Sequence, residues 1–270
     1  LNCTMSTISQ STFSSELANS CVMDTIVLPS SIKQINNYAF WNKKFKAIKI
    51  TSPDAPKLGD RVFYGSTCEI IIPHGTYFDY TEQKGWTLEY RKRLNDGVNR
   101  TIERDNVLYY PVTDTTAAVI GCTDSFTGVV VVKDTVHAFG KELNVIQIDS
   151  KAFQNKQISG LDIKNSHIQT IKSYAFDYCS SLSGIIEFPS SLKTIEQNAF
   201  SYCGSLHGLK FNEGLKSIGN SAFYRCGSIS EIVLPASLET LGNSSFQLAI
   251  NLKSVVFTPN QEKEGLLTIG

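Results

Sequence analysis

The dipeptide Ala-Phe recurs along this chain at a nearly constant interval. Complete or degenerate copies end at seven positions, which are Phe40, Phe63, Phe153, Phe176, Phe200, Phe223 and Phe246. The interval is 23 residues in the first pair, and 23, 24, 23 and 23 residues in the last five copies. Five such spacings do not arise by chance. A fixed period of about 20–50 residues is the signature of a repeat architecture, so we expect a solenoid.

Each repeat combines a short strand with a turn. Aligned on the Phe, the copies share the pattern L-x-x-I-x-L-P-x-S-L-x-x-I-G-x-x-A-F-x-x-C. In I-x-L, the two apolar residues point to one side of a strand, and the residue between them points outward. Pro29, Pro189 and Pro235 end this strand, because proline cannot donate to a continuing ladder. One unit alone leaves its apolar side in water, so we expect stacked units in which each Phe packs on the next.

Three of the seven cysteines occupy one position of the repeat. Cys179, Cys203 and Cys226 each lie three residues after the Phe. An odd number of cysteines without a C-x-x-C pair argues against both a disulfide framework and a structural zinc site. Because unpaired cysteine is among the most buried residue types, these positions predict a ladder of small buried thiols.

The repeat resembles the BspA-like leucine-rich repeats found in surface proteins of Bacteroidetes-type bacteria. The resemblance covers most of the chain, and the Ala-Phe-x-x-Cys element is its distinctive part. It implies a leucine-rich-repeat solenoid of about 23-residue units, mainly short β-strands with little helix. It also implies a secreted or cell-surface bacterial protein with a role in adhesion, binding host matrix proteins or other microbes.

The repeat is interrupted between Phe63 and Phe153, and this predicts two solenoid segments in tandem. We expect residues 1–98 to form the C-terminal part of a first solenoid. The segment from Cys68 to Trp86 resembles the closing segment of such domains, so we expect a closing cap at about residues 64–90. A solenoid needs such a cap to shield its open end.

A second solenoid is expected from residue 106 to residue 270. A polar stretch precedes it and predicts a linker at residues 99–105. Alternating apolar runs separated by turn residues then predict an N-terminal β-hairpin cap at about residues 106–148. The last residues, Gly265 to Gly270, match the middle of another unit, which suggests that the chain stops inside a repeat.

Charge and hydropathy narrow the class of partner. The chain has 25 basic and 25 acidic residues, so there is no electrostatic reason to expect nucleic acid or an anionic membrane as a partner. The longest apolar runs are far too short to span a bilayer. Residues 1–21 are rich in Ser and Thr and show no signal peptide, and we interpret the chain as an internal or processed fragment.

The sequence shows no catalytic motif. The four histidines lie outside any zinc-protease motif, and there is no nucleophile elbow, P-loop or dinucleotide fingerprint. Cys203 and His207 lie four residues apart, but the register makes one a ladder cysteine and the other an outward residue, and no third group orients them. We therefore predict no catalytic, cofactor-binding or metal-binding residue and no cofactor.

The outward positions of the strands are the candidate binding residues. By register they are Lys49, Asp162, Glu187, Lys210 and Val233. In stacked repeats such positions form a ladder, the surface that these folds use for partners. We expect a protein or glycan ligand there, host matrix included. Tyrosine and tryptophan gather around the Phe ladder instead, where we expect them to pack along the other side of the solenoid, with an adhesive patch as the alternative.

Three functions remain open on this sequence. The first is a non-catalytic binding and adhesion module, which depends mainly on the family resemblance. The second is a structural spacer that displays another domain, and a featureless outward face would favour it. The third is an enzyme with an unrecognised site, which a pocket lined by titratable residues would favour.

Overall fold

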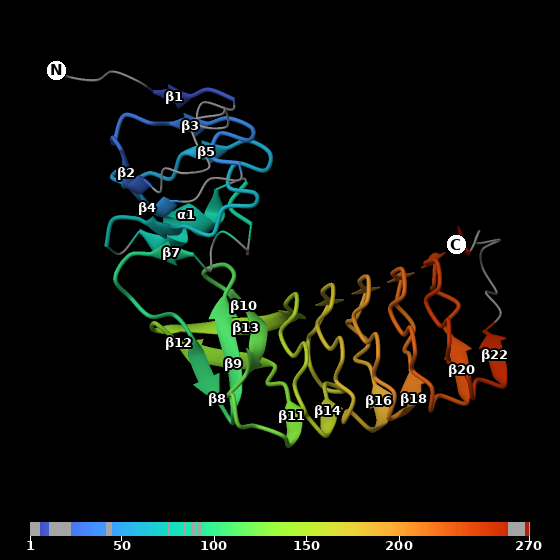
Figure 1. Cartoon of the computed structure of the whole chain (residues 1–270). Helices are drawn as coiled ribbons and strands as arrows, with labels where there is room; N and C mark the ends of the chain where they lie inside the picture. Colours follow the sequence, from blue (N-terminus) through green and yellow to red (C-terminus); the bar gives the residue numbers. More distant parts are fainter. Residues whose placement is uncertain are drawn as a thin grey trace. The chain divides into compact units, whose positions relative to one another are not determined.

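The computed structural model describes residues 6–10, 23–41, 45–74, 76–83, 85–87, 90, 93–258 and 268–269. The chain divides into two compact units (Figure 1). The first comprises residues 1–100 and 112–114, and the second comprises residues 101–111 and 115–270. Both are β-solenoids, so the predicted fold class is confirmed.

The first unit consists of coils that each contribute one strand to each of two parallel sheets. One sheet has four strands, β2 (Met23–Leu28), β4 (Phe45–Ile50), β6 (Glu69–Ile71) and the two-residue β7 (Leu94–Asn95). Two-residue strands form the other sheet, β1 (Thr7–Ile8), β3 (Gln34–Ile35) and β5 (Lys57–Leu58). Phe40 and Phe63 stack at 5.5 Å between these sheets.

A helix and two aromatic residues cover the end of this Phe stack. The helix is α1 (Tyr77–Glu82), and its Tyr80 hydroxyl donates to the carbonyl of Ser52 at 2.6 Å. The Trp86 indole donates to the carbonyl of Pro56 at 3.0 Å, and its ring lies 6.1 Å from that of Phe63. These contacts support our proposal that this segment closes the first solenoid.

The linker prediction was wrong for part of residues 99–105. Residues Ile102–Arg104 form strand β8, which pairs antiparallel with β9 (Val107–Pro111) in the second unit. Asp105 and Asn106 connect them with φ values of 51° and 65°. Two positive φ values in a two-residue loop give the turn that matches the twist of a tight hairpin, so this polar segment continues the sheet.

The second unit contains a ten-stranded sheet that turns parallel where the repeats begin. Its order is β23-β21-β19-β17-β15-β13-β10-β9-β8, with β12 paired to β13. Its remaining strands are β10 (Thr116–Cys122), β12 (Thr135–Ala138), β13 (Lys141–Ile148), β15 (Thr170–Ile171), β17 (Thr194–Ile195), β19 (Ser217–Ile218), β21 (Thr240–Leu241) and β23 (Thr268–Ile269). β23 pairs parallel with β21, Thr268 opposite Thr240 and Ile269 opposite Leu241, so it continues the row of two-residue strands.

The other side of each coil carries a longer strand. Figure 1 shows these strands following one another along the second unit, β11 (Val129–Val131), β14 (Gly160–Asp162), β16 (Gly184–Glu187), β18 (Leu206–Lys210), β20 (Glu231–Leu234) and β22 (Ser254–Phe257). The first two strands form one parallel sheet and the last four another. The extra residue of the 24-residue unit is accommodated at Gly184, where the register shifts and φ is +82°.

The core of the second unit is the predicted Phe stack. Consecutive rings from Phe153 to Phe246 lie 4.8 to 5.3 Å apart and within 7° of parallel. The backbone N–H of Phe200 donates to the carbonyl of Ala222 in the next coil at 2.7 Å, and Phe153 and Phe176 make the same bond. The prediction that each Phe packs on the next is confirmed. Phe13, the uncertain first copy, lies outside the described residues.

The predicted thiol ladder is also confirmed. Cys179, Cys203 and Cys226 are fully buried and unpaired. Their Sγ atoms lie 2.9, 3.1 and 3.2 Å from the carbonyl oxygens of the preceding Phe residues, 153, 176 and 200. Each thiol therefore donates to the coil before it. Burial raises the pKa of Cys179 and of Cys226 to about 12, and it also raises the pKa of Cys203.

Candidate binding surface

Four of the five candidate residues form one outward row on the second unit. Asp162, Glu187, Lys210 and Val233 occupy equivalent positions of β14, β16, β18 and β20. Glu187 pairs with Lys210, and Lys210 pairs with Val233. Alternation along each strand sends these side chains outward, because the residue before each of them is buried. We call this set, with Val131 and Val256 at its ends, the outward row.

Lys49 belongs to a different surface. It lies on β4 of the first unit, exposed, between Val27 and Ile71 of the neighbouring strands. The Val27 side chain is 58% exposed. The repeat register therefore predicted the outward orientation of Lys49 correctly, but Lys49 is not part of the outward row.

Two lysines neutralise the centre of the outward row. The Glu187 carboxylate lies 2.6 Å from the Lys164 Nζ and 2.8 Å from the Lys210 Nζ. The hydrogen bond from Lys164, together with the one from Lys210, lowers the pKa of Glu187 to about 2. Sequence reasoning missed Lys164. It follows Asp162 by two residues, so alternation could have placed it on the same face.

Apolar side chains flank this charged centre. Val131, Val233 and Val256 of the outward row are 43%, 43% and 45% exposed. In the adjacent row, Val129 and Ile185 are 52% and 56% exposed. The surface is therefore mixed, with paired charges between aliphatic patches, a composition that suits protein contacts better than a uniformly charged face.

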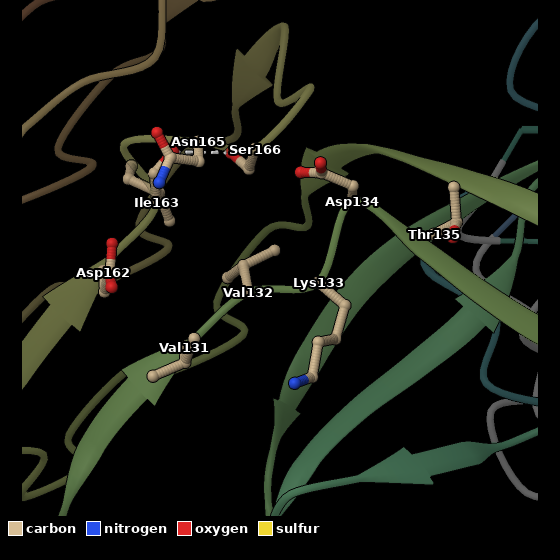
Figure 2. Close-up of a pocket in the computed structure, with 9 residues that line it drawn as sticks. All are labelled: Val131, Val132, Lys133, Asp134, Thr135, Asp162, Ile163, Asn165 and Ser166. Atoms are coloured by element: carbon tan, nitrogen blue, oxygen red, sulfur yellow. Dashed lines mark hydrogen bonds between the residues drawn. The ribbon is translucent and has the colours of Figure 1, made fainter.

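A pocket of about 330 Å³ opens at one end of the outward row. It lies between the chain that leaves β11 and the chain that leaves β14 (Figure 2), and its lining is Val131, Val132, Lys133, Asp134, Thr135, Asp162, Ile163, Asn165 and Ser166. Asp162 therefore belongs both to the outward row and to the pocket. Ligand pockets typically measure about 300–1,000 Å³, so this one can accept a side chain or a single sugar ring.

The polar groups of the pocket differ in how they are engaged. Figure 2 shows the Lys133 side chain directed away from Asp134, and its Nζ lies 2.9 Å from the carboxylate of Asp105. In the described part of the chain, the Asp134 carboxylate has a distant neighbour, the Nδ1 of His167 at 3.9 Å. Among the described residues, the Asp162 carboxylate and the Asn165 amide have no hydrogen-bond partner. The pocket thus presents acceptors and an amide donor that a ligand can use.

The geometry offers no catalytic pair at Cys203 and His207. The thiol is buried and donates to a backbone carbonyl, whereas the exposed His207 Nδ1 accepts from the N–H of Gly184 at 3.4 Å. In the part of the chain that the structure describes, no group of three or more His, Cys, Asp or Glu residues could hold a metal ion. Over the same residues, no helix is long and apolar enough to cross a bilayer.

Comparison with known proteins agrees with the repeat fold. The sequence profile of the BspA type leucine-rich repeat region matches residues 1–82 and 146–265, in six copies. A search of curated proteins found no match. Among solved structures, the T. pallidum leucine-rich repeat protein is 29% identical with a TM-score of 0.50, covering 57% of this chain and 70% of that one.

Two further structures are similar at a lower score. A leucine-rich repeat protein from Bacteroides ovatus is 28% identical with a TM-score of 0.49, covering 57% of this chain and 46% of that one. A leucine-rich cell surface protein from Faecalibacterium prausnitzii is 19% identical with a TM-score of 0.49, covering 61% of this chain and 44% of that one. The chain thus spans less than half the length of these two proteins.

Proposed function

Because this chain belongs to the BspA-type leucine-rich-repeat family, we propose that it is a non-catalytic binding module of a secreted or surface-displayed bacterial protein. The ligand is a protein or a glycan, host matrix components included. It binds the outward row of the second unit and the pocket at the end of that row. The surface or secreted localisation and the adhesive role are inferred from the family membership.

The observation that supports this proposal is the position of Asp162. Its carboxylate stands in the outward row, lines the pocket, and has no hydrogen-bond partner among the described residues. A ligand that lies along the row can therefore place one group in the pocket and reach Asp162 while it packs on Val131. Aliphatic contact supplies affinity, and the unsatisfied polar groups supply orientation.

A binding screen with matched variants tests the proposal. The immobilised chain is exposed to host matrix proteins, mucins and glycans, and each ligand that binds saturably is titrated against Asp162→Lys and Lys210→Glu. We expect both changes to weaken binding at least tenfold. Lys49→Glu tests the corresponding position of the first unit, which we expect to matter only to a ligand that also contacts that unit.

Lys216→Glu is the control for charge reversal. Lys216 is an exposed lysine that pairs with Glu239 at 2.7 Å, as Lys210 pairs with Glu187 at 2.8 Å. It lies beside β19 in the other sheet of the second unit. Equal effects of Lys210→Glu and Lys216→Glu would contradict a site on the outward row.

The spacer remains the second candidate. The observation that favours it is the Lys164–Glu187–Lys210 cluster, in which the charges of the row already satisfy one another. A folded, cooperatively melting chain that binds nothing in the screen would support this function over a binding module.

A further inference from the structure

A second row of side chains runs along the turns of the second unit, two residues after each Phe. Its members are Asn155, Tyr178, Tyr202, Arg225 and Leu248. All five have positive φ, between 58° and 61°. The turn requires this conformation, because it aims the backbone N–H of the first four at a carbonyl of the next coil, 2.8 to 2.9 Å away. We call this set the turn row.

Large side chains are an unexpected choice in the turn row. Glycine adopts positive φ without strain, asparagine tolerates it, and bulky residues seldom occupy it. The turn row nevertheless has tyrosine at two positions and arginine at a third, and Tyr178 is 47% exposed. Strained backbone and exposed aromatic surface both oppose folding stability. Because positive φ recurs in the turn of every coil, the exposed tyrosine ring is the feature that distinguishes position 178.

The three large side chains form a continuous stack. The rings of Tyr178 and Tyr202 lie 4.1 Å apart and within 10° of parallel. The Arg225 guanidinium lies 5.3 Å from the Tyr202 ring centroid and 5.8 Å from that of Tyr224. Tyr202 therefore has Tyr178 on one side and Arg225 on the other, which holds its ring in place.

The stack ends at Tyr178 with an open position. Asn155 occupies the turn row one coil earlier, and its side chain is too short to reach over the Tyr178 ring. Within the described residues, neither an aromatic nor a cationic group covers that face of Tyr178. The Asn155 amide also has no hydrogen-bond partner there. One flat ring can therefore stack on the exposed part of the Tyr178 face, where a longer side chain at position 155 would lie, with the Asn155 amide at its edge.

We propose that this open position binds a pyranose ring of a glycan. One face of a pyranose carries C–H bonds with partial positive charge, and these pack on the electron-rich face of tyrosine. Its edge carries hydroxyl groups, which the Asn155 amide can both donate to and accept from. A cationic side chain is disfavoured because Arg225 already places a positive charge in the same stack.

This site is independent of the outward row, which lies on the strands and not on the turns. The test uses the whole chain and soluble tetrasaccharides of β-linked glucose, galactose or N-acetylglucosamine, titrated by calorimetry. We expect saturable binding of at least one tetrasaccharide. Tyr178→Gly removes the platform and also relieves the backbone strain, so we expect at least tenfold weaker binding by a protein that remains folded.

Asn155→Tyr gives a second, opposite test. The new ring would fill the open position and extend the stack, so we expect sugar binding to fall at least tenfold in a protein that still melts cooperatively. Tyr178→Phe keeps the platform and should bind within twofold of the wild type. Tyr174→Ala is the matched control, because Tyr174 has φ +62° in the same coil but takes no part in the stack.

The outcomes separate this proposal from the proposed function. Lys210→Glu should leave tetrasaccharide binding unchanged, and Tyr178→Gly should leave unchanged the binding of a ligand to the outward row. The glycan site is overturned if no tetrasaccharide binds, or if Tyr178→Gly and Asn155→Tyr bind like the wild type. Binding at Tyr178 of a protein only, with no sugar, also overturns it.

Discussion

The Cys203 thiol donates a hydrogen bond to the backbone carbonyl of Phe176 in the preceding coil, with Sγ and O 3.1 Å apart. Cys179 and Cys226 make the same contact one coil earlier and one coil later. The ladder cysteines thus bind one coil to the next through protonated thiols. A thiolate is poorly solvated in the core, so burial raises the pKa values of these cysteines and keeps the thiols protonated.

The first prediction concerns alkaline pH. A thiol whose pKa is raised on folding contributes stability that is complete below the unfolded value near 9 and is lost as the pH rises toward the folded value near 12. We expect the urea midpoint to fall between pH 9 and pH 11. The loss should be smaller in Cys179→Ala/Cys226→Ala, although this variant is less stable at pH 7. If the urea midpoint falls equally steeply with pH in both proteins, the buried thiols are not the cause of the fall.

The second prediction concerns the Phe stack. Phe200 is fully buried between Phe176 at 4.8 Å and Phe223 at 5.3 Å. Phe200→Ala should lower the free energy of unfolding by about 3–5 kcal/mol. Lys210→Ala should change it by less than about 0.5 kcal/mol, because Lys210 is a surface residue. Thermal and urea melts of both variants check the register, and a harmless Phe200→Ala would refute it.

The third prediction concerns a close approach of two coils. A Cβ at Gly219 would lie 2.6 Å from the backbone nitrogen of Gln197, so the coils could not keep their spacing. Gly219→Ala should cost about 1–3 kcal/mol, the usual range for overpacking. Gly204→Ala is the control, because a Cβ there meets no atom within 4 Å. Equal melting temperatures for the two variants would show that the coils move apart to accept the new Cβ.

The fourth prediction concerns an ion pair in the first unit. The Arg100 guanidinium lies 4.1 Å from the Tyr77 ring centroid, and its NH2 group donates to the buried Asp96 carboxylate at 2.8 Å. Arg100→Met removes the positive charge that pairs with this buried carboxylate, so we expect a loss of about 3–5 kcal/mol. Lys156→Met breaks the exposed pair with Asp124 and should leave the melting temperature nearly unchanged. Thermal melts compare the two variants, and a fall in melting temperature for Lys156→Met as large as that for Arg100→Met would contradict the prediction.

Local repetition explains how much of this structure could be predicted. Every coil uses the same contacts with its neighbours, so the period of Phe153, Phe176 and Phe200 predicts the stacking and the core, and the cysteine that recurs three residues after the Phe predicts the thiol ladder. The same register predicts that Lys210 and Glu187 point outward, because alternation along a strand is a property of the backbone. The partner-binding role of these residues remains a prediction.

Tertiary structure decided the features that break the repetition. The pocket joins Asp134 and Asp162, which come from different coils and from non-equivalent positions, so no period relates them. The hairpin that places Ile102–Arg104 in a sheet depends on two positive φ values at polar residues that also suit a linker. The stack of Tyr178 on Tyr202 depends on side-chain rotamers and on the distance between coils. A repeat pattern determines which residues are neighbours, but only the packed chain determines which of them touch and which leave a position open.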